Sequence, residues 1–303
     1  MSDLRLDHNG GPSLSIHCGP TELLRYVYEP IDAQLEAPRP YFHPLRTLAG
    51  DEVSLCRPHD HVWHKGLALS LPNVGPANFW GGPTYLREGG YQQLPNNGAM
   101  RHVKFDRITL EAGRASVQER LTWVTEPGET WFDEERAFHV AVEAGAGAWL
   151  LVFATRFVNV WTEPVVIGSP TTEGRPSAGY GGLFWRGPRS FTGGVVQVPG
   201  ARGGDELMGA RAPWMAFTGT HDDHGRVSTV VMEDASSNQD HPTRWFVRST
   251  PFACLCPAPF FDTEVVLEPG DAVALRYAVV IADGEADGAP EWARLGVAAL
   301  EGW

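Results

Sequence analysis

Four stretches between residues 101 and 160 alternate apolar and polar side chains, and this pattern constrains the fold more than any other feature. Residues 101–110 and 115–124 flank a turn at Gly113, and residues 131–142 and 148–160 flank a glycine-rich turn at 143–147. A period of two is typical of a half-buried β-strand, and glycine can adopt the positive φ that tight hairpins require. Successive hairpins predict an antiparallel sheet.

The rest of the chain continues as short β-branched and aromatic runs separated by turns, and it contains 34 Gly and 24 Pro. Only residues 291–300 show helical spacing, with Pro290 near the first turn. We therefore predict one all-β domain over residues 1–303, a large antiparallel β-sandwich with one short C-terminal helix. Further strands are expected at 23–28, 52–56, 66–71, 213–218, 227–232, 244–248, 263–267 and 272–281.

Composition excludes several classes of protein. A hydrophobic content of 43% supports a packed core, and a net charge of −13 argues against nucleic-acid and anionic membrane surfaces. No apolar run is long enough to cross a bilayer, and residues 1–7 lack the apolar core of a signal peptide, so a cytoplasmic protein is expected. The cysteines match no zinc spacing and are expected to be reduced core residues: Cys18, Cys56, Cys254 and Cys256.

Residues 57–67, RPHDHVWHKGL, concentrate histidines and charges around Trp63. In an extended chain His59 and His61 would share one face and His64 the other, whereas a bent loop could bring all three together. We predict that His61 and His64 are an acid/base pair, since imidazole titrates near neutral pH, and that His59 contacts substrate. A divalent metal on His59, His61 and His64 is an alternative, as is a structural loop with histidines bonded to backbone carbonyls; no cofactor is predicted.

Three other segments supply candidate walls of the same pocket. His43 and Arg46 lie in an apolar segment, where Arg46 could hold a substrate oxygen or pair with a structural acid such as Asp51 or Glu52. Residues 173–189 are glycine-rich and are expected to form a loop over the site, with Glu173 as a candidate general base or a solvated carboxylate. The predicted substrate-binding residues are completed by Trp80, Tyr180, Trp185, Arg186, Asn238, His241 and Arg248.

The strand predicted at 244–248 has a defined facing. Arg244, Phe246 and Arg248 share one face, and Trp245 and Val247 share the other. The first face is expected to be a polar and aromatic wall of the site or a set of cross-strand pairs.

Several motifs together resemble one known family: Tyr41-Phe-His-Pro-Leu-Arg46, Asp60-His61, His64-Lys-Gly-Leu67, Phe79-Trp80, Gly182-Leu-Phe-Trp-Arg186 and His241-Pro-Thr-Arg-Trp-Phe-Val-Arg248. Over residues 38 to 284 the chain resembles the DUF6807 family, which also carries the name methane oxygenase PmoA, although the true membrane methane monooxygenase spans the bilayer several times. The resemblance implies a sandwich similar to the galactose-mutarotase supersandwich and a role in bacterial sugar catabolism. The family often has His-His before Lys/Arg-Gly, and the first of these is Trp63 here, which weakens the metal alternative.

These observations lead to three hypotheses about function. The first is an enzyme that acts on a small-molecule carbohydrate by general acid/base chemistry, through epimerisation, elimination or hydrolysis. The second is a non-catalytic sugar-binding or regulatory module, since sandwiches host both roles. The third, from the family name, is a metal-dependent oxygenase or lyase.

Overall fold

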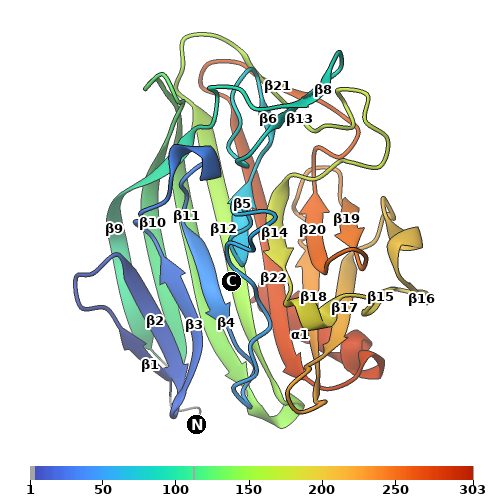
Figure 1. The fold of residues 1–303 in the computed structure, drawn as a ribbon. Helices are drawn as coiled ribbons and strands as arrows, with labels where there is room; N and C mark the ends of the chain where they lie inside the picture. The colour runs from blue at the N-terminus through green and yellow to red at the C-terminus, as the bar shows by residue number, and fades with distance from the viewer. Residues whose placement is uncertain (1–3, 112, 303) are drawn as a thin grey trace.

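A computed structural model describes residues 4–111 and 113–302, and most of their strands belong to two large antiparallel sheets (Figure 1). In spatial order, the eight-stranded sheet contains β1 (Leu4–Asp7), β2 (Ser13–Cys18), β3 (Thr21–Val27), β4 (Tyr41–Leu45), β5 (Leu67–Ser70), β14 (Gly182–Arg186), β20 (Cys254–Ala258) and β19 (Arg244–Arg248).

The nine-stranded sheet is built around the long central strands that the alternation predicts. Its spatial order is β16 (Ala201–Gly203), β15 (Val195–Val198), β17 (Trp214–Thr220), β18 (Val227–Asp234), β22 (Ala272–Asp283), β12 (Ala148–Asn159), β11 (Thr130–Glu143), β10 (Arg114–Val124) and β9 (Ala99–Glu111). Gly113, between β9 and β10, has a φ of +73°, as a tight hairpin requires.

Short elements complete the fold at the ends of the sheets. Two small sheets pair β21 (Val265–Leu267), β13 (Val165–Gly168) and β6 (Asn73–Val74), and β7 (Thr84–Leu86) with β8 (Gly90–Gln92). Single 3-10 turns are η1 (Gln34–Glu36), η2 (Ala144–Ala146), η3 (Arg189–Phe191), η4 (Asp205–Leu207) and η5 (Ala286–Gly288).

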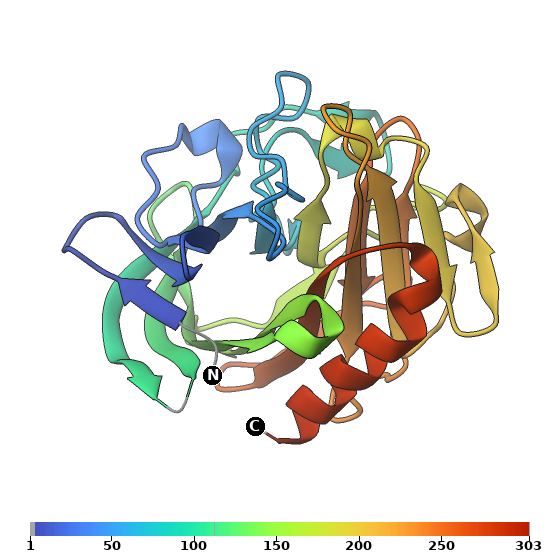
Figure 2. The same ribbon diagram turned by 90° about the horizontal axis from the view of Figure 1, so that it is seen from below.

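The main core lies between the two large sheets, and α1 (Ala289–Glu301) covers a second apolar layer. Side chains from both sheets form the central cluster, which includes the buried Trp123, Trp185 and Trp245. Helix α1 packs against β22, β18 and β12 on the outer side of the nine-stranded sheet (Figure 2). No helix in the described part of the chain has the length and apolar character needed to cross a bilayer.

The predicted fold class is confirmed, as are the four central strands and the C-terminal helix. The strand expected at 52–56 is wrong, because this segment makes only isolated bridges, from Glu52 to Arg46 and from Cys56 to Lys65. The loop expected over 173–189 is half correct: 173–181 is irregular, but 182–186 is strand β14. Its alternation is hidden because both faces are buried, with Leu183 and Trp185 in the core and Phe184 and Arg186 on the opposite side.

Candidate functional site

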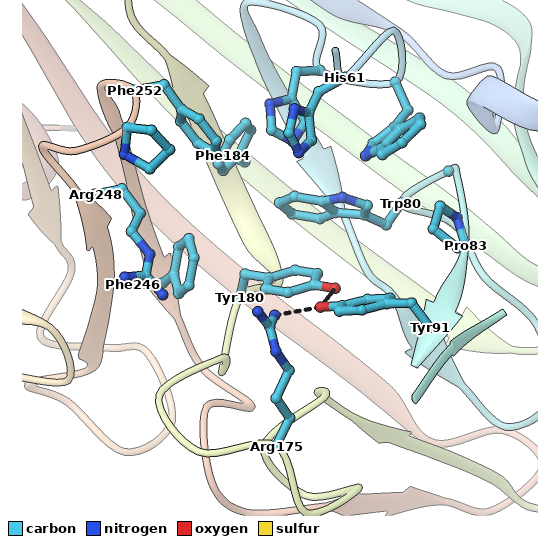
Figure 3. A pocket seen from close by; sticks show the side chains of 14 residues that line it. His61, Trp80, Pro83, Tyr91, Arg175, Tyr180, Phe184, Phe246, Arg248 and Phe252 are labelled. Carbon is cyan, nitrogen blue, oxygen red and sulfur yellow. Dashed lines mark hydrogen bonds between the residues drawn. The ribbon is translucent and has the colours of Figure 1, made fainter. Parts of the chain in front are cut away.

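A cavity of about 540 Å³ lies on the face of the eight-stranded sheet that points away from the core. This size is typical of sites for small ligands. Loops from four parts of the chain surround it, as the labelled side chains of Figure 3 show. Its walls are formed by His61, Trp63, His64, Trp80, Gly81, Pro83, Tyr91, Arg175, Tyr180, Phe184, Phe246, Arg248, Pro251 and Phe252.

Strands β14 and β19 supply the floor. Phe184 of β14 and the Phe246 and Arg248 pair of β19 point to the cavity, while Trp245 and Val247 point to the core. The facing predicted for residues 244–248 is therefore confirmed. Successive side chains of a strand point to opposite faces of the sheet, so one packs in the core and the next borders the cavity.

The histidine segment is a tight loop rather than an extended strand. The backbone N–H of Arg57 donates to the His64 carbonyl at 2.8 Å, and that of His64 donates to the His61 carbonyl at 2.9 Å. The buried Arg39 clamps the loop from behind, with Nη2 donating to the Trp63 carbonyl at 2.7 Å. Buried Lys65 is held by Glu36 and Asp32, so it stabilises the loop and does not face the cavity.

This loop brings His61 and His64 together, with their rings stacked at a centroid distance of 4.7 Å. His61 Nδ1 lies 3.2 Å from Asp60 Oδ2, and Arg189 donates to the other oxygen of Asp60 at 2.6 Å. Burial acts to raise the pKa of Asp60, but the hydrogen bonds from Arg189 and the backbone lower it. The hydrogen bonds have the larger combined effect, so the pKa of this carboxyl lies well below its usual range. His64 is only 4% exposed, and burial with the nearby His61 and Arg186 lowers its pKa well below 6.5, so it is neutral at neutral pH.

Aromatic side chains make the opposite wall. Trp80 packs against Tyr180 and Phe184, with ring centroids 4.6 and 4.7 Å away. Tyr180 and Tyr91 share a hydrogen bond of 2.9 Å between their hydroxyls, and Arg175 donates to the Tyr91 hydroxyl (Figure 3). Burial raises the pKa of Tyr180 well above 10, so this hydroxyl keeps its proton.

Trp63 can occupy its place only because two glycines leave room for it. A Cβ on Gly82 would lie 2.6 Å from the indole ring, and one on Gly81 would lie 2.6 Å from the Trp63 Cβ. Both glycines also have positive φ angles, 97° for Gly81 and 66° for Gly82. The Phe79-Trp80-Gly-Gly82 motif therefore places Trp80 in the wall of the cavity and leaves space for Trp63 beside it.

Arg186 lies directly behind this cavity and is 0% exposed. None of its three guanidinium nitrogens has a hydrogen-bond partner among residues 4–111 and 113–302. Its guanidinium carbon lies 3.8 Å from the centre of the Phe252 ring. Burial lowers the pKa of Arg186 to about 10, so the charge remains at neutral pH.

The structure leaves several predicted site residues outside the cavity. His43 bonds to Ser54 at 2.9 Å, and Arg46 bonds to Glu22 at 2.8 Å, so both stabilise the region around β3 and β4. His59 is exposed beside Arg189, and Trp185 is in the core, where its indole N–H donates to the Val53 carbonyl at 2.8 Å.

Three more predicted residues have other environments. Glu173 is half-buried in the 170–181 loop and does not line the cavity. Asn238 donates to Asp234 at 2.8 Å, and His241 Nδ1 lies 2.9 Å from the same carboxylate. Asn238 and His241 thus support the turn before β19, whereas His61, His64, Trp80, Tyr180 and Arg248 do meet at the cavity.

The three histidines of the metal alternative do not converge, since His59 points to Arg189. In the described ranges, no group of three or more His, Cys, Asp or Glu side chains is placed to hold a metal ion.

Sequence reasoning missed Tyr91, Arg175 and Phe252, whereas Phe246 lies on the strand face that was expected to be a wall of the site or a set of cross-strand pairs. Tyr91 and Arg175 come from segments 84 residues apart that only tertiary contact joins. Phe252 follows Pro251, and an aromatic residue beside a proline was the one local signal available.

The fold and site define an antiparallel β-sandwich with an aromatic cavity that carries two histidines. The chain matches the family of unknown function DUF6807 over residues 13–293, and it belongs to that family. The predicted membership is confirmed, and the match extends beyond the predicted 38–284 at both ends. No curated protein matches the chain in sequence.

Several solved structures resemble this chain at low similarity. The α-galactosidase AgaA of Geobacillus stearothermophilus, a GH36 enzyme in complex with raffinose, is 12% identical, with a TM-score of 0.43 over 95% of this chain and 42% of that chain. The α-galactosidase of Lactobacillus brevis is 11% identical, with a TM-score of 0.46 over 94% and 42%. The heparan sulfate lyase HepC of Pedobacter heparinus is 7% identical, with a TM-score of 0.35 over 90% and 33%. This chain therefore spans less than half the length of each of these proteins.

Proposed function

We propose that the protein is an enzyme that binds a sugar derivative in the His61–His64 cavity and moves a proton at a carbon of the bound sugar. The observation that carries the proposal is the pair of stacked imidazoles that borders an aromatic cavity of about 540 Å³. Aromatic faces such as that of Trp80 pack against the apolar face of a sugar ring, and polar groups around them bind its hydroxyls.

His61 is the proton-transfer group in this proposal. Asp60 lies beside Nδ1 at 3.2 Å and is itself held by Arg189, so it favours the tautomer with the proton on Nδ1. The free Nε2 is then the base. His64 stacks on the same ring as a neutral imidazole.

The composition of the walls favours epimerisation or elimination over hydrolysis. Glycoside hydrolysis generally uses two carboxylates on either side of the scissile bond. No Asp or Glu is among the described residues that line the cavity. The hydroxyls of Tyr91 and Tyr180 lie across from His61 and can return a proton to the substrate (Figure 3).

Incubation of candidate sugars in D₂O with the protein tests this function, because proton abstraction and return place deuterium at the reacting carbon. NMR would show deuterium at one C–H position, with or without net conversion. Replacement of His61 or His64 by Ala is expected to slow the exchange by roughly 100- to 10,000-fold. His59→Asn is the matched control, since this exposed neighbour lies outside the cavity and should leave the exchange unchanged.

Asp60→Asn tests positioning separately from proton transfer. It should lower the exchange rate and change its pH profile, since the imidazole loses the carboxylate charge that lies 3.2 Å from its Nδ1, while sugar binding is retained. If a sugar binds but neither exchanges nor converts over hours, the protein is a binding module and the enzymatic proposal fails. If both histidine variants retain full exchange, the assignment of the base fails.

A further inference from the structure

The guanidinium of Arg186 is a buried charge that has no hydrogen-bond partner among the residues that the structure describes. Strand β14 fixes its backbone, since the Arg186 N–H donates to the Gly66 carbonyl at 2.7 Å and its carbonyl accepts from Leu55 at 2.9 Å. The acid that acts on it through space, Asp60, is already bonded to Arg189. A buried charge left unpaired is strongly unfavourable. Arg186 is therefore better explained by a ligand than by the stability of the fold.

Only one aromatic ring separates Arg186 from the cavity. Phe252 lines the cavity on one side and lies 3.8 Å from the guanidinium on the other. It is half-buried, in the short connection between β19 and β20, whereas the residues of β14 below it are fully buried. Phe252 is thus the element whose displacement would expose Arg186 to a ligand.

The charge around the cavity has the sign opposite to that of the chain. The protein carries a net charge of −13, yet the lining includes Arg175 and Arg248 and, within the described residues, no carboxylate. With Arg186 behind the wall, the local field attracts an anion.

We propose that the sugar derivative carries a carboxylate, which takes the place of the Phe252 ring at Arg186 and pairs with its guanidinium. This inference rests on the proposed function of the cavity and adds the class of substrate, a sugar acid. The planar guanidinium matches a carboxylate in a two-point pair. One buried positive charge balances one carboxylate, whereas a phosphate dianion would leave a buried negative charge uncompensated.

A carboxylate at Arg186 also accounts for the proton transfer. His61 takes the proton from the carbon next to the carboxylate, and the electron pair of that C–H bond moves into the carboxyl group to give an enediolate dianion. Arg186 balances one of its two negative charges, and the imidazolium that His61 becomes on taking the proton balances the other. Return of a proton to the other face of that carbon gives the epimer. Expulsion of the oxygen on the next carbon, which leaves with a proton from a wall hydroxyl, gives the unsaturated acid. Neither outcome needs an oxidant or reductant.

Calorimetric titration with hexuronates and hexonates, beside matched hexoses and hexuronate methyl esters, tests the inference. The acids should bind about 100-fold more tightly than the neutral probes, as expected for a charge-assisted pair. Arg186→Met should remove this preference and leave the neutral probes unchanged. Arg202 is an exposed arginine of β16 that pairs with Asp287, and Arg202→Met should retain the preference.

The Phe252→Ala variant keeps the test decisive if Arg186→Met does not fold. Removal of the ring should raise the ratio of acid to neutral affinity, and a lower ratio would overturn the inference. Equal binding of acids and esters, or preferred binding of hexose phosphates, would also overturn it while the proposed sugar enzyme stands. Failure of every probe to bind or exchange would instead count against the proposed function itself.

Discussion

Two fully buried arginines in the same sandwich have opposite environments. Arg136, in the core between the sheets, is 2% exposed and donates to both oxygens of Glu134, at 2.8 and 3.1 Å, and to the Tyr26 hydroxyl at 3.2 Å. Arg186 is 0% exposed and has no such bond to any residue that the structure describes. Both rest against a phenylalanine, Phe153 for Arg136 and Phe252 for Arg186.

The two arginines differ in whether the protein itself supplies a partner for the buried charge. Glu134 is also bonded by Trp123 at 2.7 Å and Thr155 at 2.8 Å, so every member of the Arg136 network is satisfied inside the protein. The Arg186 guanidinium lies one ring away from a cavity and lacks the matching acid. A site that is missing one charge in this way is prepared for a ligand that supplies it.

The same substitution at the two positions should have opposite effects on stability. Arg136→Met is expected to lower the free energy of unfolding by about 3–5 kcal/mol, because Glu134 would remain buried without its counter-charge. Urea denaturation monitored by circular dichroism measures this loss. The double variant Arg136→Met/Glu134→Met should recover much of it, and a single variant as stable as the parent would contradict the comparison.

Histidines that are buried in the neutral form should make the fold sensitive to acid. Burial, with Arg46 and Arg25 nearby, lowers the pKa of His43 from 6.5 to about 4. The unfolded chain therefore binds more protons than the folded chain below pH 6.5, and stability falls as the pH drops from 6.5 toward 4. The loss is at most about 3 kcal/mol for this residue. Urea midpoints measured across this range should fall less steeply in His43→Asn, and an unchanged slope would exclude this cause.

Arg186→Met should leave the free energy of unfolding unchanged or raise it by about 1 kcal/mol, since an unpaired buried charge is replaced by an apolar chain of similar length. Because Arg186 lowers the pKa of His64, the same variant should raise that pKa, which NMR titration of the imidazole can follow. A destabilisation as large as that of Arg136→Met would show that Arg186 is structural.

An exposed arginine should show the smallest change in the free energy of unfolding among the three Arg→Met variants. Arg202 is 45% exposed in its side chain and pairs with the still more exposed Asp287 at 2.6 Å. Arg202→Met should change the free energy of unfolding by less than about 1 kcal/mol in the same urea measurement. A larger effect would mean that the changes in unfolding free energy across the three Arg→Met variants do not depend on how deeply each arginine is buried and how it is paired.

Strand periodicity made most of the fold predictable, but only where one face of a strand is solvated or the run is long. Strands β9 to β12 alternate visibly along 11 to 14 residues each. β14 and β20 were missed because all five residues of each are buried, and glycine or proline within them suggested a loop or turn. β14 places Phe184 at the floor of the cavity, so part of the error fell on the site itself.

The candidate site was predictable in part, for a similar reason. The clustering of His61, His64 and Trp80 with Tyr180 depended on residue types that are rarely left without a role, and the structure brings them together. His43, Arg46, Asn238 and His241 have the same residue types, yet each has a protein partner near in the fold. A sequence shows that a side chain can bind, but not whether another residue already satisfies it.

By itself, the sequence determined that the chain is an antiparallel β-sandwich with one C-terminal helix, and it predicted that residues 57–67 belong to a site. Both follow from local properties, the period of two and the concentration of imidazoles. The tertiary structure alone decided which histidines meet, which arginine is left unpaired, and that Phe252 stands between Arg186 and the cavity. These depend on contacts between segments up to about two hundred residues apart, and a side chain's free energy of burial is set by such partners rather than by its neighbours in the chain.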